Sequence, residues 1–276
     1  MGKRMSNAPV YFTVAQVRFN PVLNLEGYLP TIQDRMRAAR FPDFKRQVFQ
    51  QLIVPFSAGD GSQIPTPSFL PQARCVFGDI EGTSEFVLEN NALALQTTAY
   101  ETFETFSKVL LEGLGIVHEA LRLDFTERVG LRYLDAVLPR ASESLSDYLT
   151  PEVLGLSQKL NGQMLHSVSE TVAMNAVGQL ISRVIIQDGH VGLPPELMAL
   201  APRLAPRFTQ PNGRHAIIDT DAFHEQREAF SLEKLESRLV ALHDEILKSF
   251  EATATPHALA VWAQQDRGGH GNCNDL

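Results

Sequence analysis

The feature that most constrains the fold is the run Val10–Phe19, which is dominated by β-branched and aromatic side chains and ends at Asn20-Pro21. This composition favours an extended strand, and the Asn-Pro pair marks its end. A second run of the same kind covers Phe125–Val137. Because a sheet with an apolar face must be covered by a second layer, two such runs require helices or further strands packed against them.

Helical periodicity separates these two runs. Apolar side chains recur at steps of three and four in residues 25–39 and again in residues 98–117. Between the two helical stretches, residues 74–80, 84–88 and 92–99 have the composition of strands. The order strand, helix, strands, helix, strand is that of a ferredoxin-like layer, in which helices cover one face of an antiparallel sheet.

The second half of the chain repeats the mixture of strands and helix. Segments 163–176, 179–187 and 215–221 favour strands, and Ser231 is a suitable N-cap for a long helix. The apolar residues of this helix follow near-heptad spacing, which fits either a helix that covers the sheet or a dimer seam. Because the seam is short, the covering helix is the favoured interpretation, and a homodimer stays as the alternative.

We therefore predict an α+β protein with antiparallel sheet covered by helices on one face. The chain has 276 residues, 44% of them hydrophobic, which is ordinary for a protein with a real core. Its predicted parts are a flexible N-terminus at residues 1–9, a ferredoxin-like half at 10–138, a connector at 139–162, a second α+β half with the long C-terminal helix packed on a second sheet region at 163–262, and a disordered tail at 263–276.

Charge and cysteine content limit the partners and the compartment. The formal net charge of -8 opposes phosphate backbones, so nucleic acid is not expected as a bulk electrostatic ligand. The two cysteines, Cys75 and Cys273, provide neither a disulfide framework nor a zinc site. No apolar stretch is long enough to cross a bilayer, and the N-terminus lacks the apolar region of a signal peptide. We expect a cytoplasmic protein that has no contact with the membrane.

Three short segments carry a resemblance. They are Val17–Pro21, Val129–Leu134 and Ile217–Phe223, the last of them before a long final helix. In this order and spacing the chain resembles a sporadically distributed family of conserved, uncharacterised bacterial proteins. The resemblance spans roughly residues 9–262 and implies no assigned activity, although patchy distribution is typical of genes in mobile-element or antiviral defence neighbourhoods. The chain has Ala15-Gln16 where the family tends to place an acidic residue in the first strand.

Charged residues inside the predicted strands are the main candidates for a site. By strand alternation, Arg18 shares a face with Gln16, and Asp219 shares a face with Asp221. A buried charge without a partner is costly, so we expect Arg132, and also Arg18, to pair with Asp219 or Asp221 across the sheet. The alternative is that these arginines line a cleft and bind a carboxylate or phosphate.

The candidate binding residues are Arg18, Arg132, Tyr133, Asp219 and Asp221. On one strand face the two aspartates lie about 7 Å apart, too far to chelate one ion unaided. We therefore predict no metal ligand, and the sequence shows no catalytic, dinucleotide or phosphate-binding motif from which a catalytic residue or cofactor could be predicted.

Three functions fit these observations. The favoured hypothesis is a non-enzymatic binding, regulatory or adaptor protein that acts with a partner protein, whose strand or helix docks at an exposed sheet edge. The first alternative is a metal-dependent hydrolase or nuclease-like enzyme that uses Asp219 and Asp221. The second is an RNA-binding module, because ferredoxin-like sheets can stack bases on exposed aromatic side chains.

Overall fold

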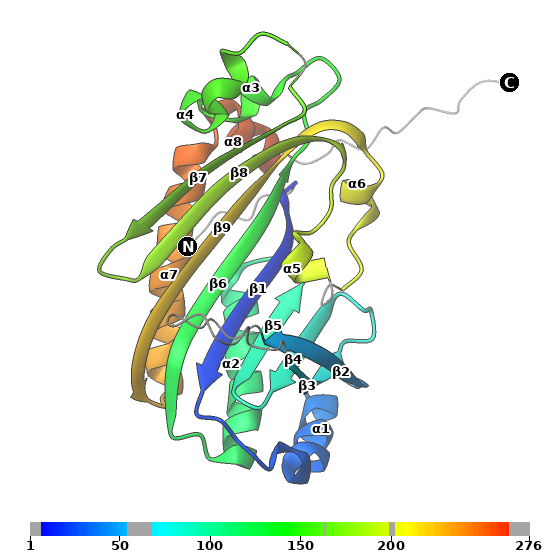
Figure 1. Ribbon diagram of the computed structural model, residues 1–276, viewed down its shortest axis with the longest axis vertical. Helices are drawn as coiled ribbons and strands as arrows, with labels where there is room; N and C mark the ends of the chain where they lie inside the picture. The colour runs from blue at the N-terminus through cyan, green and yellow to red at the C-terminus, as the bar shows by residue number, and fades with distance from the viewer. Residues whose placement is uncertain (1–6, 54–67, 163, 199–201, 265–276) are drawn as a thin grey trace, which may run out of the picture.

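The structure, a computed structural model, describes residues 7–53, 68–162, 164–198 and 202–264. These residues form one antiparallel sheet of nine strands in the order β2-β3-β4-β5-β1-β6-β9-β8-β7, with the longer helices behind it (Figure 1). The α+β class and the antiparallel sheet are therefore confirmed. The strands are β1 (Val10–Phe19), β2 (Asp43–Ile53), β3 (Ser68–Gly78), β4 (Ser84–Glu89), β5 (Ala92–Thr97), β6 (Phe125–Val137), β7 (His166–Met174), β8 (Gln179–His190) and β9 (Asn212–Ala229).

The helices differ widely in length. They are α1 (Leu29–Ala38), α2 (Phe103–Leu121), α3 (Leu145–Tyr148), α4 (Pro151–Leu154), α5 (Pro195–Met198), α6 (Pro206–Thr209), α7 (Leu232–Thr253) and α8 (Pro256–Ala263), with 3₁₀ turns η1 (Leu25–Tyr28) and η2 (Gly155–Gln158). Among the described residues, no helix is both long and apolar enough to traverse a lipid bilayer.

The first half does not show the ferredoxin-like order. It contributes six strands, in the order β2-β3-β4-β5-β1-β6, and β1 pairs antiparallel with both β5 and β6. In β2 and β3, Asp43–Ile53 and Ser68–Gly78 pair along their full length. No strand or helix is predicted above for residues 44–54, where β2 adds a sixth strand to the five predicted in this half.

The two predicted halves share one sheet, because β6 of the first pairs with β9 of the second from Phe125↔Ala229 to Val137↔Ala216. The connector at 139–162 contains α3, α4 and η2, and its Tyr148 is buried in a small core with Trp262 of α8. The predicted flexible N-terminus and tail lie outside the described residues, except for residues 7–9 and 263–264.

Helices α2 and α7 form the layer that covers one face of the sheet. The Oγ1 of Thr102 accepts a hydrogen bond from the backbone N–H of Thr105, which caps α2 at its start. Ser231 caps α7 in the same way by accepting from the N–H of Lys234. The apolar seam of α7 is buried against β6, β9 and α2, so this helix spans the junction of the two halves and does not lie on a separate sheet region.

The opposite face of the sheet is only partly covered. Residues 191–198 and 202–211, which include α5 and α6, lie over one end of this face (Figure 1). Leu197 and Phe208 of this segment pack against Tyr11 of β1, and the Tyr11 hydroxyl donates to the Gly192 carbonyl oxygen at 2.8 Å. We call the remainder, the side of β6, β9, β8 and β7 that faces away from α7, the open face.

One close approach between helix and sheet predicts a matched pair of stability effects. An alanine methyl at Gly113 of α2 would lie 2.4 Å from the Phe86 ring, whereas at Gly115 it would meet only Leu232 at 3.8 Å. Gly113→Ala is expected to lower the free energy of unfolding by about 1–3 kcal/mol through overpacking. Gly115→Ala is expected to raise it by up to about 1 kcal/mol through helix propensity. Urea unfolding measures both, and equal stabilities would contradict the packing of α2 on β4.

Candidate binding face of the sheet

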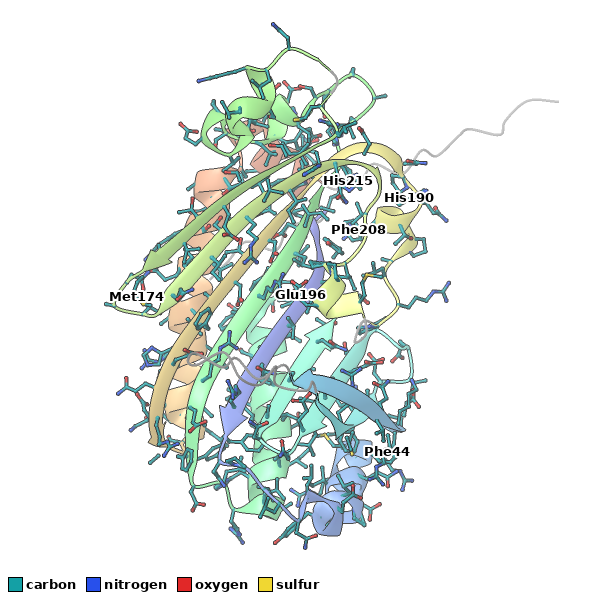
Figure 2. The ribbon with its side chains drawn as sticks, viewed as in Figure 1. Phe44, Met174, His190, Glu196, Phe208 and His215 are labelled. Atoms are coloured by element: carbon teal, nitrogen blue, oxygen red, sulfur yellow. The ribbon has the colours of Figure 1, made fainter. Side chains whose placement is uncertain are left out.

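Strands β6 and β9 bring the predicted residues Arg132, Asp219 and Asp221 to the open face, and β8 adds Arg183 beside them. In the β6–β9 register Arg132 lies opposite Asp221, and Leu134 lies opposite Asp219. In the β8–β9 register Arg183 lies opposite Asp219. Because side chains in a strand alternate between faces, all of these point to the side that α7 does not cover. Glu196 lies on the same side, on α5 next to β1 (Figure 2).

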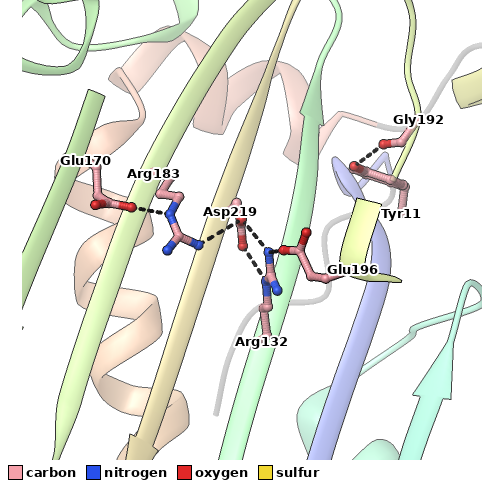
Figure 3. Close-up of polar contacts among 7 residues, drawn as sticks. All are labelled: Tyr11, Arg132, Glu170, Arg183, Gly192, Glu196 and Asp219. Atoms are coloured by element: carbon pink, nitrogen blue, oxygen red, sulfur yellow. Dashed lines mark hydrogen bonds and ion pairs between the residues drawn. The ribbon is translucent and has the colours of Figure 1, made fainter. Parts of the chain in front are cut away.

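Asp219 is the centre of an ionic network (Figure 3). The Arg132 guanidinium donates to it twice, from Nε to Oδ1 and from Nη2 to Oδ2, each at 2.7 Å. Arg132 Nη2 also donates to Glu196 Oε1 at 2.9 Å. On the other side Arg183 Nη1 lies 3.5 Å from Asp219 Oδ2, and Arg183 Nε donates to Glu170 of β7. The network therefore ties α5, β6, β9, β8 and β7 together.

The buried carboxylate of Asp219 is compensated from within the network. Asp219 is only 2% exposed, so its charge depends on the two guanidinium groups. Burial acts to lower the pKa of Arg132, but the hydrogen bonds and charge of Asp219 outweigh burial and raise it. The predicted pairing of Arg132 with Asp219 is present. Because the Arg132 guanidinium already donates two hydrogen bonds to Asp219, these donors are not available to bind a carboxylate or phosphate ligand.

Asp221 lies outside this network. It lines a hollow of about 230 Å³ on the same face, together with Gln16, Arg128 and Leu197, over a floor that includes Gly130. Burial raises the pKa of Asp221, and the charges of Arg128 and Arg132 oppose that shift. Among the described residues Asp221 has no hydrogen bond or ion pair, so the two predicted aspartates have different environments.

Arg18 does not pair with either aspartate. The β1–β6 register places it opposite Arg128, and the β6–β9 register places Arg128 opposite Glu225, which lies four residues along β9 from Asp221. At about 3.3 Å per residue this separation is about 13 Å, too far for a direct contact. Arg18 is exposed and has no hydrogen bond or ion pair among the described residues. The expectation that Arg18 pairs with Asp219 or Asp221 is therefore wrong.

Tyr133 lies on the opposite face from the arginines. It precedes Leu134 and follows Arg132 in β6, and the pleat therefore turns its side chain toward α2 and α7. Its hydroxyl donates to the Tyr100 hydroxyl at 3.1 Å, and the ring is buried. The structure therefore does not bring Tyr133 to the same site as Arg132, Asp219 and Asp221.

Strand β7 exposes apolar side chains on the open face. Val168, Val172 and Met174 are 56%, 55% and 74% exposed, and their registers with β8 place them on the same face as Glu170 and Arg183. Figure 2 shows Met174 at the tip of the β7–β8 hairpin. Strand β7 is the last in the sheet order, so no described strand pairs with its outer edge.

Asp219 and Asp221 do not form a metal centre with other residues that the structure describes. The oxygens of Asp219 accept hydrogen bonds from Arg132 and face Arg183. Within the described ranges, no three or more His, Cys, Asp or Glu side chains are grouped so that they could hold an ion.

No protein-family model and no curated protein matches this chain. The resemblance noted from the sequence stays a prediction.

Sequence reasoning missed Glu170, Arg183 and Glu196, which complete the network. Arg183 follows the same rule that identified Arg132, because it is a charge inside an apolar strand, Gln179–His190. Glu196 lies in a Pro-rich loop, and nothing in its local sequence indicates that this loop crosses the sheet. Tertiary structure alone places Glu196 against Arg132.

Proposed function

We propose that this protein is a non-enzymatic binding module, an adaptor that takes up a β-strand of a partner protein along the outer edge of β7. The observation that carries the proposal is the reversed polarity of β7. Its apolar residues Val168, Val172 and Met174 face away from the helices and are exposed, and Ser167 and Thr171 alternate with them on the other face.

This polarity is the reverse of the usual pattern in a sheet with one covered face. A sheet covered by helices on one face normally turns its apolar side chains toward the helices and its polar ones to solvent. In β7 the exposed aliphatic side chains cost free energy in the isolated protein, and exposed apolar patches of this kind typically mark interaction surfaces. The outer edge of β7 also presents backbone N–H and C=O groups that a further strand can pair with.

The addition of a partner strand would account for both the exposed aliphatic side chains of β7 and its outer backbone edge, with which no described strand pairs. A partner strand that pairs with β7 makes backbone hydrogen bonds along its edge, while its alternate side chains extend the open face beside Val168 and Val172. Cross-strand pairs of aliphatic or aromatic residues are favourable, so the partner segment is extended and rich in such residues at every second position. Glu170 is already bonded to Arg183, which makes the neighbouring partner position a polar one.

The ionic network supports this role as a rigid base. It links β6, β9, β8 and β7 through Arg132, Asp219, Arg183 and Glu170, and so holds the edge strand in place beneath the proposed surface. The two alternatives are less well supported. Asp219 is held by arginines, which leaves a hydrolase without its first carboxylate, and the exposed β7 side chains are aliphatic, whereas base stacking needs aromatic rings.

A lysine on the apolar face of β7 is expected to abolish partner binding. Val172→Lys puts a charge where the partner's apolar side chains pack, and Thr171→Lys is the matched control on the same strand with its side chain on the other face. Tagged wild-type protein and both variants are used to recover partners from native host cells, and hydrogen exchange then follows the β7 amides with and without the recovered protein. We expect at least tenfold less partner with Val172→Lys, undiminished recovery with Thr171→Lys, and slower exchange of the β7 amides in the complex.

Two outcomes would contradict the proposal. One is equal recovery of the same partner by both lysine variants. The other is a purified wild-type protein that is dimeric by light scattering and becomes monomeric with Val172→Lys, because a second copy of this chain would then occupy the edge.

A further inference from the structure

A buried carboxyl group without a partner lies on the helix-covered face of the sheet. Asp135 of β6 is 7% exposed and has no hydrogen bond or ion pair among the described residues. It lines a cavity of about 150 Å³ between the start of β1, the start of α2 and the middle of α7. A buried polar group without a partner costs free energy, so the position of Asp135 requires a physical explanation.

The cavity has an aromatic and acidic lining. Tyr100, Phe103 and Tyr133 provide ring surface, and Glu101 and Glu104 lie at its exposed rim. None of the described residues that line it is a lysine or an arginine. The start of α2 would otherwise favour an anion through its backbone N–H groups, but the two glutamates place negative charge there.

His243 adds no positive charge to this lining. Its ring stacks on Phe103 with centroids 4.2 Å apart and planes 3° apart, and its Nδ1 lies 3.4 Å from the Tyr133 hydroxyl. Burial lowers the pKa of His243, so the imidazole is neutral at physiological pH. The Tyr133 hydroxyl donates to Tyr100 and is therefore not available as a donor to Asp135.

Two further buried groups near Asp135 have no partner among the described residues. They are the hydroxyls of Thr13 and Thr220, which lie opposite Tyr133 on the two strands that flank it. Tyr133 is two residues from Asp135 on the same face of β6, so all three unpartnered groups belong to one region beneath the helices.

We propose that this cavity binds a small organic amine in its ammonium form, with Asp135 as the counter-ion and the rings of Tyr100 and Phe103 around the cation. An ammonium donates hydrogen bonds that the carboxylate accepts, and aromatic faces attract a cation within about 6 Å. The volume is roughly ten times the minimum that one water molecule needs, which leaves room for an apolar body on the amine. Apolar side chains, including Val10 and Ile246, line the wall and fit such a body.

Binding of this cation is coupled to the ionisation of Asp135. Burial raises the pKa of Asp135 to about 7, so a proton must leave before the ammonium can pair with it. Among the described residues, the other titratable groups that face the cavity are Tyr133 on the same strand, Tyr100, Glu101 and Glu104 at the start of α2, and His243 on α7. Burial raises the pKa of Tyr100 to about 12 and that of Tyr133 as well, so neither tyrosine ionises near neutral pH.

The test is binding of 2-phenylethylamine by calorimetry at pH 6 and pH 8. The neutral 2-phenylethanol and the anionic 3-phenylpropionate serve as isosteric probes. We expect the wild type to bind the amine about tenfold more tightly at pH 8 than at pH 6, because about a tenth of Asp135 is ionised at the lower pH. We expect the alcohol and the acid to bind at least tenfold more weakly than the amine at pH 8.

Two variants separate the cavity from the rest of the molecule. Asp135→Asn is expected to weaken amine binding at least tenfold at pH 8 and to remove its pH dependence, whereas Glu236→Gln, an exposed substitution on α7, leaves both unchanged. If Asp135→Asn does not fold, Glu104→Gln at the rim provides the second measurement, with weaker amine binding expected. The proposal is overturned if the amine does not bind the wild type, if the alcohol or the acid binds as tightly, or if Asp135→Asn folds and binds the amine as the wild type does. None of these outcomes depends on partner binding at β7.

Discussion

Replacing Arg132 with methionine is expected to lower the free energy of unfolding by about 3–5 kcal/mol, the usual cost of removing one member of a buried ion pair. The reason is the position of Asp219, which is buried and would keep only the 3.5 Å contact with Arg183. Glu196 would also lose its hydrogen bond. Urea unfolding monitored by circular dichroism measures this loss.

The double variant Arg132→Met/Asp219→Leu separates a broken pair from lost packing. Because neither partner is left charged and buried, we expect it to recover most of the stability that Arg132→Met loses. Arg18→Met is the control, since Arg18 is an exposed strand arginine without an ion pair among the described residues, and its effect is expected within about 0.5 kcal/mol. If the double variant is as unstable as Arg132→Met, the stability lost in Arg132→Met does not come from leaving the Asp219 charge uncompensated.

The stability of the protein is expected to fall by up to about 4 kcal/mol between pH 4 and pH 7 through Asp135, since one pKa unit corresponds to about 1.4 kcal/mol. Burial raises the pKa of this carboxyl from its ordinary value of 3.8 to about 7. Between these values the unfolded chain has lost the proton and the folded protein keeps it. The folded state therefore binds more protons, so stability falls as pH rises and levels off above pH 7.

Asp135→Asn removes this dependence, because the amide does not titrate. At pH 8 the variant is expected to be more stable than the wild type by up to about 4 kcal/mol, and at pH 4 the two are expected to be similar. Glu236→Gln, an exposed substitution on α7, is the control and should reproduce the wild-type profile. Urea unfolding from pH 4 to pH 8 measures all three proteins, and a wild-type profile in Asp135→Asn would show that another group controls the slope.

Several parts of the fold were predictable because they depend on local chemistry. Strands β1 and β6 and helix α7 follow from composition and from periodicities of two and 3.6 residues. The helix start at Ser231 was also predictable, because an N-cap side chain bonds within its own turn. The start of α2 was harder to predict. The helical pattern in the sequence extends back to residue 98, whereas the helix begins after its N-cap, Thr102.

Parity along a strand predicted part of the site. Because side chains alternate in a pleated strand, the sequence placed Asp219 and Asp221 on one face of β9, and charge balance predicted a partner for Arg132. The same rule could not identify which aspartate pairs with Arg132, because this depends on the register between β6 and β9. It also could not exclude Arg18 as a partner of the aspartates, although Arg18 is level with Glu225 of β9, four residues from Asp221.

The sequence by itself determined the α+β class, the alternation of faces within each strand and the need to neutralise charges in apolar strands, because each of these depends on residues close together in the chain. Only the tertiary structure decided that one sheet joins both halves, that Glu196 reaches Arg132, that β7 turns its valines away from the helices and that Asp135 is buried beside a cavity. These features depend on strand order and on the path of a loop over the sheet. Contacts between residues far apart in the chain determine the strand order and the path of the loop, and local propensity does not depend on such contacts.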